Sequence, residues 1–264
     1  MLARVAGALL LVVGMVVPKL AFGAEGLHEP WDKLLKTYVS DGEVDYQGLK
    51  KKSVPELDKY LASLSKIDPA TLGKNDQLAY YLNLYNASVV KGVIDIFPTK
   101  SVIEPLTKNP IPSMNFFMRP RLTVGGPATS PAIKKSSTNN VSLDALENKI
   151  IRPTFKDARV HFALVCAAKG CPSLPDHAFV GKDIEHCLDH LATNFFKSKK
   201  GLRVKGATVY LSSIFNWYRD DFGTTKEAVL AFVGKYRKGL PKKARVRYLD
   251  YDWDLNNLRK KSRR

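Results

Sequence analysis

The chain has 264 residues and a formal net charge of +17, because 42 residues are Lys or Arg and only 25 are Asp or Glu. With 45% hydrophobic residues, the chain can bury a core without help from disulfides, which excludes a small fold held together by its cysteines. There are only three cysteines and five histidines, so a place where they gather is informative.

Residues 1–24 are predicted to be a secretory signal peptide. Arg4 precedes an apolar run, Val5 to Val17, and small residues suited to cleavage follow Pro18. The run is too short to span a bilayer comfortably, although the sequence does not decide whether it is cleaved. We therefore expect a periplasmic or secreted protein with no membrane span after signal removal.

The positive charge predicts an anionic partner. Removing residues 1–24 takes away Arg4 and Lys19, which lowers the net charge by two, from +17 to +15. Nucleic acid would suit this charge, but an exported protein rarely meets it, so we expect no nucleic acid. Anionic cell-envelope components are the expected partner. The terminal residues 259–264 are predicted to be a basic, disordered tail.

The first half of the chain is predicted to be helical. Apolar residues at helical spacing indicate helices over Trp31 to Tyr38 and from Val54, and a long one, Asn75 to Ile96, that is apolar nearly all round. Residues 101–140 are rich in Pro, Gly, Ser, Thr and Asn, which predicts a long loop with a short hairpin-like piece at Arg121 to Gly125.

The second half mixes short helices and strands. Ser142 is the expected N-cap of a helix that ends at Arg152–Pro153. The remaining predicted elements are a buried strand, Val160 to Val165, helices Gly181 to Lys197, Ser212 to Tyr218 and Thr224 to Tyr236, a hairpin, Leu202 to Leu211, and a last strand, Val246 to Asp252. The class is α+β: a mostly helical single domain, residues 25–258, around a small antiparallel sheet.

Candidate chemistry gathers after the predicted strand. Cys166 and Cys171 lie in the turn that ends it, and a thiol in such a place is a possible nucleophile, with Cys166 favoured. His161 is five residues before Cys166, which on an extended strand sends the two side chains to opposite faces, so another residue such as His177 is an alternative base. Lys169 is a candidate source of positive charge. The competing interpretations are a small disulfide loop or an inert buried thiol, because constellations of this kind are easily found by eye.

Three more residues are candidates. Glu147 sits in an apolar helix, where it either orients His161, acts as an acid or base, or complements the helix dipole. Asn83 and Asn86 share a helix face; they either brace the cysteine loop or contact substrate. The spacing of potential ligands matches no zinc pattern, so no metal or cofactor is expected.

Several motifs together resemble a known family. They are Leu78-Ala79-Tyr80-Tyr81-Leu82-Asn83-Leu84-Tyr85-Asn86-Ala87, Leu143-Asp144-Ala145-Leu146-Glu147, Ala158 to Cys166, Cys171-Pro172-Ser173-Leu174, Trp217 to Phe222 and Tyr251 to Asn256. In this order they resemble the family called domain of unknown function 547, DUF547, over about Trp31 to Asn256. Ala158 departs from the family pattern, which usually has Pro there. The resemblance implies a domain found in exported bacterial proteins and in intracellular plant proteins, which weighs against a purely structural disulfide.

Two functions remain open on the sequence. One is a thiol-dependent hydrolase or acyltransferase acting on an envelope peptide or polymer. The other is a non-catalytic envelope binding or scaffolding domain in which the Cys166–Cys171 loop is structural. The sequence names neither the substrate nor the oligomeric state.

Overall fold

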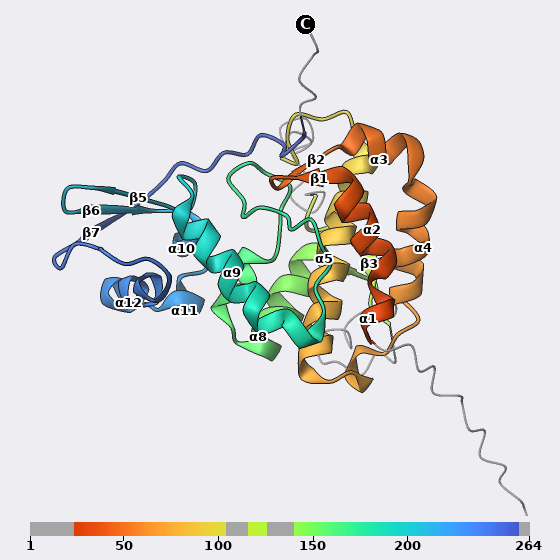
Figure 1. Cartoon of the computed structure of the whole chain (residues 1–264), viewed down its shortest axis with the longest axis horizontal. Helices are drawn as coiled ribbons and strands as arrows, with labels where there is room; N and C mark the ends of the chain where they lie inside the picture. Colours follow the sequence, from red (N-terminus) through yellow and green to blue (C-terminus); the bar gives the residue numbers. More distant parts are fainter. Residues whose placement is uncertain (1–23, 104–115, 126–139, 259–264) are drawn as a thin grey trace, which may run out of the picture.

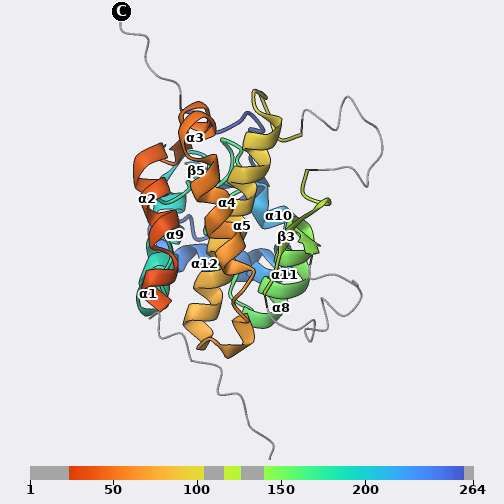
Figure 2. The same cartoon turned by 90° about the vertical axis from the view of Figure 1, so that its right-hand side faces the viewer.

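Helix α5, Lys74–Ile96, runs through the middle of the molecule (Figures 1 and 2). The computed structural model describes residues 24–103, 116–125 and 140–258. Within these ranges, none of the helices has the length and apolar character needed to cross a membrane. Helix α5 is buried over most of its length because its apolar residues occur on every face, as the sequence predicts. It begins one residue earlier than predicted, with Gly73 as the N-cap, and ends before Pro98.

The N-terminal helices pack against α5. They are α1, Ala24–Leu27; α2, Glu29–Tyr38; α3, Tyr46–Lys52; and α4, Val54–Leu64, followed by a 3₁₀ turn, η1, Pro69–Thr71. Two strands, β1, Val39–Ser40, and β2, Glu43–Val44, form a hairpin between α2 and α3. Its turn residues Asp41 and Gly42 both have positive φ, the backbone that a two-residue hairpin turn needs.

The segment that carries Glu147 is a composite helix. Strands β3, Pro120–Thr123, and β4, Asn140–Ser142, pair antiparallel and lead into α7, Leu143–Ala145. The backbone N–H of Ala145 donates to Ser142 Oγ at 3.0 Å, so the predicted N-cap is confirmed. A turn of π-helix, η3, Leu146–Ile151, follows, then α8, Arg152–Phe155. The predicted end at Arg152–Pro153 is wrong, because the helical backbone continues from the π-helical turn through Pro153 to Phe155.

The predicted strand Val160 to Val165 is also wrong. Its first half is a 3₁₀ helix, η4, Ala158–Phe162, started by Asp157, whose side chain accepts from the N–H of Arg159 at 2.9 Å. The residues after it are irregular. They need no sheet partner because a side chain of α5 satisfies their backbone groups, as described below. An apolar run of six residues fits a buried irregular segment as well as a buried strand.

The C-terminal part forms a second layer. It contains η5, Gly181–Asp183; α9, Ile184–Lys197; β5, Leu202–Lys205; β6, Thr208–Leu211; α10, Ile214–Trp217; α11, Arg219–Phe222; α12, Lys226–Tyr236; and β7, Arg245–Tyr248. The predicted hairpin β5–β6 is confirmed, but β7 joins β6 in parallel, so the sheet is mixed. The α+β class is confirmed, although the strands of the described residues form three separate small sheets instead of one.

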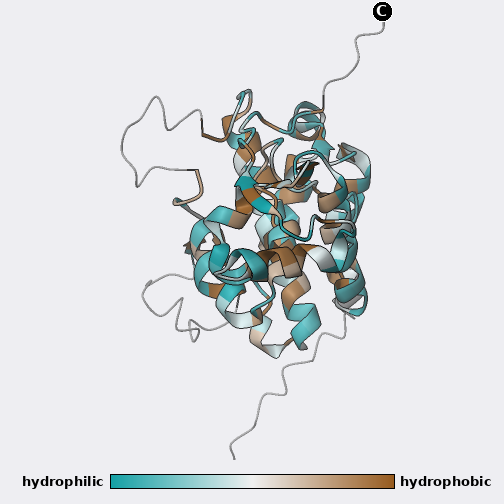
Figure 3. Ribbon diagram, turned by 90° about the vertical axis from the view of Figure 1, so that its left-hand side faces the viewer, coloured by the Kyte–Doolittle hydropathy of each residue, from teal (hydrophilic) through white to brown (hydrophobic). Residues whose placement is uncertain are grey.

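Two hydrophobic clusters make up the core. The larger surrounds α5, and the smaller lies beneath β5–β7 and is rich in phenylalanine, with Phe162 against Phe195 and Phe196. Hydrophobic segments gather in the middle of the ribbon and hydrophilic ones toward its outside (Figure 3). Residues 158–171 run between the clusters: Val160 and Ala163 belong to the larger and Phe162 to the smaller. The predicted signal peptide, apart from Ala24, and the predicted tail, 259–264, lie outside the described residues.

Candidate functional site

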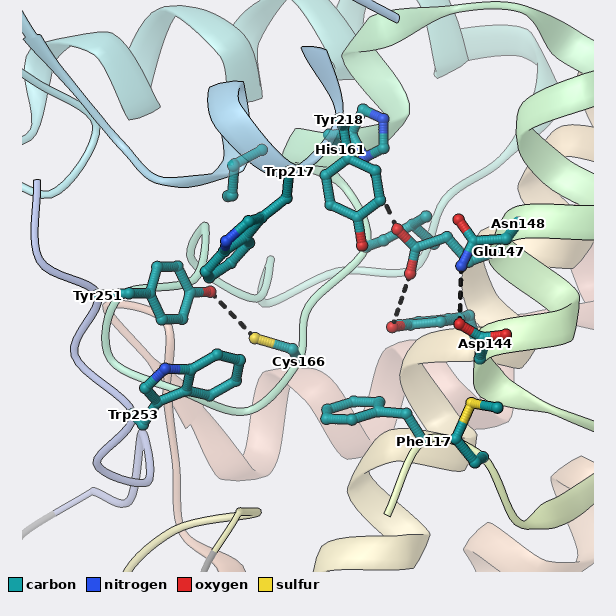
Figure 4. A pocket seen from close by; sticks show the side chains of 14 residues that line it. Phe117, Asp144, Glu147, Asn148, His161, Cys166, Trp217, Tyr218, Tyr251 and Trp253 are labelled. Atoms are coloured by element: carbon teal, nitrogen blue, oxygen red, sulfur yellow. Dashed lines mark hydrogen bonds and ion pairs between the residues drawn. The ribbon is translucent and has the colours of Figure 1, made fainter. Parts of the chain in front are cut away.

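A cavity of about 240 Å³ opens beside residues 158–171, where the two hydrophobic clusters meet. The cavity is lined by residues of α5, of the chain just before β3, of the composite helix and of η4. The loop between Cys166 and Cys171, α10 and the chain after β7 complete the lining. The lining residues are Tyr85, Phe117, Met118, Asp144, Glu147, Asn148, His161, Leu164, Cys166, Ile214, Trp217, Tyr218, Tyr251 and Trp253. Three of the four residues predicted to be catalytic, Glu147, His161 and Cys166, therefore lie in one cavity (Figure 4).

Cys166 is the partly exposed thiol of the cavity, and it is a free cysteine in this structure. Its Sγ lies 2.8 Å from Cys171 Sγ and 3.1 Å from the hydroxyl of Tyr251. Hydrogen bonds from Cys171, then from Tyr251, outweigh burial and hold the pKa of Cys166 below its usual value. Figure 4 shows the sulfur pointing toward Tyr251, at the aromatic side of the cavity. The arrangement favours a thiolate.

Cys171 is the complementary thiol. It is a free cysteine, 3% exposed, and it does not line the cavity. Burial, then its hydrogen bond to Cys166, raises the pKa of Cys171 well above the usual value. The backbone N–H of Cys166 donates to Cys171 Sγ at 2.8 Å, which fixes the two thiols against each other. Cys171 thus keeps its proton, and it is the donor in the hydrogen bond between the two sulfurs once Cys166 is ionised.

The loop between the two cysteines is held by the C-terminal segment. The N–H of Lys169 donates to Asp254 O at 2.8 Å, and that of Gly170 donates to Asp252 O at 2.8 Å. A Cβ on Gly170 would lie 2.9 Å from the backbone nitrogen of Asp252, so only glycine allows this approach. The Lys169 ammonium pairs with Asp254 at 3.1 Å outside the cavity, and so is not placed to charge-stabilise Cys166 directly.

Glu147 faces the cavity from the π-helical turn η3. The extra residue in such a turn widens the helix and turns its side chains, and π-turns often occur at functional sites. The carboxylate is 7% exposed and accepts a hydrogen bond from the Tyr85 hydroxyl at 3.2 Å. Burial, then the charge of Glu147, raises the pKa of Tyr85 and of Tyr218, so both phenols remain donors.

His161 is held between two carboxylates instead of against a thiol. Its Nε2 lies 2.6 Å from Asp221 Oδ2, and its Nδ1 lies 3.7 Å from Glu147 Oε1. The Tyr218 ring stacks on it, with ring centroids 4.1 Å apart. Among the described residues, neither sulfur has a hydrogen bond to His161. Glu147 thus lies beside Nδ1 of the ring, and orienting His161 is one of the roles that the sequence analysis considered for Glu147.

Asp221 is a residue that the sequence analysis missed as part of the site. The sequence analysis used its motif, Trp217 to Phe222, only as part of the family resemblance. Arg152 Nε also donates to Asp221 Oδ2, at 2.6 Å. Burial alone would raise the pKa of Asp221, but hydrogen bonds from His161 and Arg152 outweigh it and keep the pKa well below its usual value. The carboxylate is ionised and anchors the imidazole.

Asn83 and Asn86 brace backbone. Asn83 exchanges two hydrogen bonds with Phe179, at 2.8 and 3.0 Å. Asn86 donates to Ala163 O at 2.9 Å and accepts from the N–H of Val165 at 3.0 Å. Both amides are buried, and neither lines the cavity, so the structure favours bracing over the predicted contact with substrate. Asn86 holds the segment leading into Cys166.

An aromatic wall, defined as Trp217, Tyr251 and Trp253, stands beside the thiol (Figure 4). The Trp217 and Tyr251 rings are 4.8 Å apart, and those of Tyr251 and Trp253 are 4.7 Å apart. Trp217 is 47% exposed, which is unusual for a tryptophan in a packed cluster.

The alternative base and the third cysteine of the chain lie elsewhere. His177 is exposed, pairs with Asp176 at 3.0 Å and does not line this cavity. Cys187 is a half-buried free thiol on α9, and burial raises its pKa. In the described ranges, no group of three or more histidine, cysteine or acidic side chains is arranged to hold a metal ion.

Comparison with known proteins agrees with the resemblance. Residues 69–196 match the model of a family described as "Protein of unknown function, DUF547". The matched range includes α5, Glu147, His161, Cys166 and Cys171, but not Tyr251 or Asp221. No curated protein and no solved structure matches the chain.

Proposed function

We propose that this chain, whose residues 69–196 match the DUF547 family, is an exported thiol-dependent hydrolase or acyltransferase that acts on an envelope peptide or polymer. One observation carries the proposal: the thiol with the lowered pKa, Cys166, is the one that opens into the cavity, opposite a buried carboxylate. A depressed thiol pKa in a cleft is the condition that nucleophilic cysteines need.

In the proposed cycle, the proton of the Cys166 thiol passes through water to Glu147. The thiolate attacks the carbonyl carbon of an ester or amide, a C–S bond forms, and the leaving group departs with a proton returned by Glu147. The Tyr251 hydroxyl, 3.1 Å from the sulfur, donates to the developing oxyanion. Water or an amine then loses a proton to Glu147 and attacks the thioester, which releases the acyl product and restores the thiol.

An exposed basic face supports the envelope as the place of action. The sheet β5–β6–β7 lies at the side of the molecule far from α2 and α4, with α11 and α12 below it in this view (Figure 1). Its register aligns Arg203 with Tyr210 and Tyr210 with Arg247, while Lys205 and Arg245 both align with Thr208. All four cationic side chains are exposed and share one face, because they follow the alternation of their strands. Such a face attracts phosphate- or carboxylate-bearing polymers.

Acyl-enzyme formation tests the proposal. Mixed with p-nitrophenyl acetate, the protein is expected to release a burst of nitrophenolate on the order of one per chain, followed by slower turnover. Mass spectrometry should find the acetyl group on Cys166 during the burst. Cys166→Ser should lose the burst, and Cys187→Ser, which removes the other thiol that is not fully buried, should keep it.

Glu147→Gln separates the two chemical steps. With this substrate its burst should persist, because nitrophenolate leaves without a proton and the Cys166 proton can pass to bulk water. Turnover should fall by roughly 10²-fold or more, because water needs a base to attack the acetyl thioester. A folded protein that shows no acetylation of Cys166, or an acetyl group that is never discharged, would contradict an enzymatic role. Either result would leave the non-catalytic binding or scaffolding domain as the function.

A further inference from the structure

The charge of the cavity is opposite to that of the chain. Asp144 and Glu147 bring two carboxyl side chains to the lining, and among the described residues no Lys or Arg lines it. Arg152, which reaches this network through Asp221, is committed to that carboxylate at 2.6 Å and lies over the Tyr218 ring, 4.9 Å from its centroid. In a chain of net charge +17, this local excess of acid is not a property of the surface in general.

The aromatic wall, like the two carboxyl side chains, favours a positively charged ligand. The faces of indole and phenol rings carry negative potential and attract ammonium groups, with Trp the strongest. Trp217 and Trp253 lie stacked, with centroids 5.8 Å apart and an interplanar angle of 29°, and Trp217 is 47% exposed. The carboxylates and the wall lie on opposite sides of the cavity in Figure 4, with Cys166 between them.

From these two features we infer that the substrate group entering the cavity beside Cys166 is an amine in its ammonium form, such as the terminal amine of an alkyl side chain. Carboxylates and phosphates are disfavoured because both walls repel them. The inference deepens the proposed function and rests on Cys166 being the nucleophile. It assigns the acyl acceptor: the bound ammonium loses one proton to Glu147, and the resulting amine forms a C–N bond at the thioester carbon. The C–S bond then breaks, and the second proton of the nitrogen passes to the departing sulfur, which restores the Cys166 thiol.

The charge preference of Cys166 toward matched alkylating reagents tests the inference without requiring turnover. Iodoacetamide and iodoacetate are nearly the same size and differ by one negative charge. Relative to free cysteine, the rate ratio of iodoacetamide to iodoacetate at Cys166 should be on the order of tenfold higher, because one charge near carboxylates in a partly buried site has an effect of that size. In addition, n-butylammonium should slow the iodoacetamide reaction more than n-butanol does.

Two variants localise the effect. Asp144→Asn should lower the rate ratio by roughly threefold to tenfold, because it removes one carboxylate from the cavity. Asp254→Asn makes the same change of charge at an exposed position paired with Lys169 and should leave the ratio within about twofold. Asn148 Nδ2 donates to Asp144 Oδ1 at 2.9 Å, and Asn at 144 can still accept that bond.

The outcomes separate the inference from the proposed function. If Cys166 reacts quickly with iodoacetamide but its rate ratio equals that of free cysteine, the amine preference is wrong and the nucleophile stands. Equal protection by n-butylammonium and n-butanol would also overturn the preference. If Cys166 reacts more slowly than free cysteine with iodoacetamide itself, the proposed function fails first, whatever the ratio.

Discussion

Replacing Cys171 with alanine is expected to slow the alkylation of Cys166 by iodoacetamide near neutral pH by roughly threefold to tenfold. The variant removes the donor whose sulfur lies 2.8 Å from Cys166, the largest cause of the lowered pKa of Cys166. A hydrogen bond to a charged group is worth about 1.5–3 kcal/mol, which corresponds to roughly one to two pKa units. At a pH below the pKa, the thiolate fraction falls tenfold for each unit by which the pKa rises. A more basic thiolate is a better nucleophile, and that gain offsets about half of the loss.

A serine at position 171 is the matched control. Its hydroxyl can still donate to the Cys166 sulfur, so Cys171→Ser should retain most of the reactivity that Cys171→Ala loses. The measurement is the rate of Cys166 labelling against pH, followed by peptide mass spectrometry on reduced protein. The midpoint should shift to higher pH in the order wild type, serine, alanine. An alanine variant that reacts as fast as wild type, with the same midpoint, would mean that Cys171 does not stabilise the thiolate.

Replacing Asn86 with alanine is expected to reduce the free energy of unfolding by roughly 2–4 kcal/mol. The amide satisfies two buried backbone groups, Ala163 O at 2.9 Å and the N–H of Val165 at 3.0 Å. Without it, both groups lose their partner in the core, at about 1–3 kcal/mol each, with some recovery if water enters. Urea unfolding followed by far-UV circular dichroism measures the change.

Asn83 provides the comparison for this variant. It makes the same pair of hydrogen bonds, at 2.8 and 3.0 Å, but to Phe179 instead of the segment before Cys166. Asn83→Ala should therefore destabilise the protein to a similar extent and leave the alkylation rate of Cys166 within about twofold. Asn86→Ala should also slow that reaction. A loss below about 1 kcal/mol for Asn86→Ala would show that its two bonds do not hold the segment.

The elements whose cause is local could be predicted from the sequence. Helix α5 follows from apolar residues on all faces between Gly73 and Pro98, and the cap at Ser142 follows from the preference of serine for N-caps. The pairing of Asn83 and Asn86 on one face also follows from helical spacing, and a buried amide needs partners. The gathering of Glu147, His161 and Cys166 agrees with the residues chosen as candidates.

The rest of the site depends on contacts between distant residues. Tyr251 reaches Cys166 across 85 positions, and Asp221 reaches His161 across 60, so neither role has a signal in local spacing. The segment from Val160 to Val165 was predicted to be a strand because its own residues do not reveal where its backbone groups find partners. The partner is the side chain of Asn86 on α5. That mistake also suggested that the geometry between His161 and Cys166 would be that of a strand.

The most direct test of a reactive Cys166 compares two thiols within the same folded chain. Cys187 is a free, half-buried thiol whose pKa is raised by burial, whereas the pKa of Cys166 is lowered by its hydrogen bonds. The rates at which iodoacetamide labels the two thiols should be measured from about pH 5 to pH 10, a range that extends below and above the pKa of an ordinary thiol. Cys166 should react with a midpoint below that of free cysteine, and Cys187 with a midpoint above it. A Cys166 midpoint at or above that of Cys187 would contradict the assignment of Cys166 as the nucleophile.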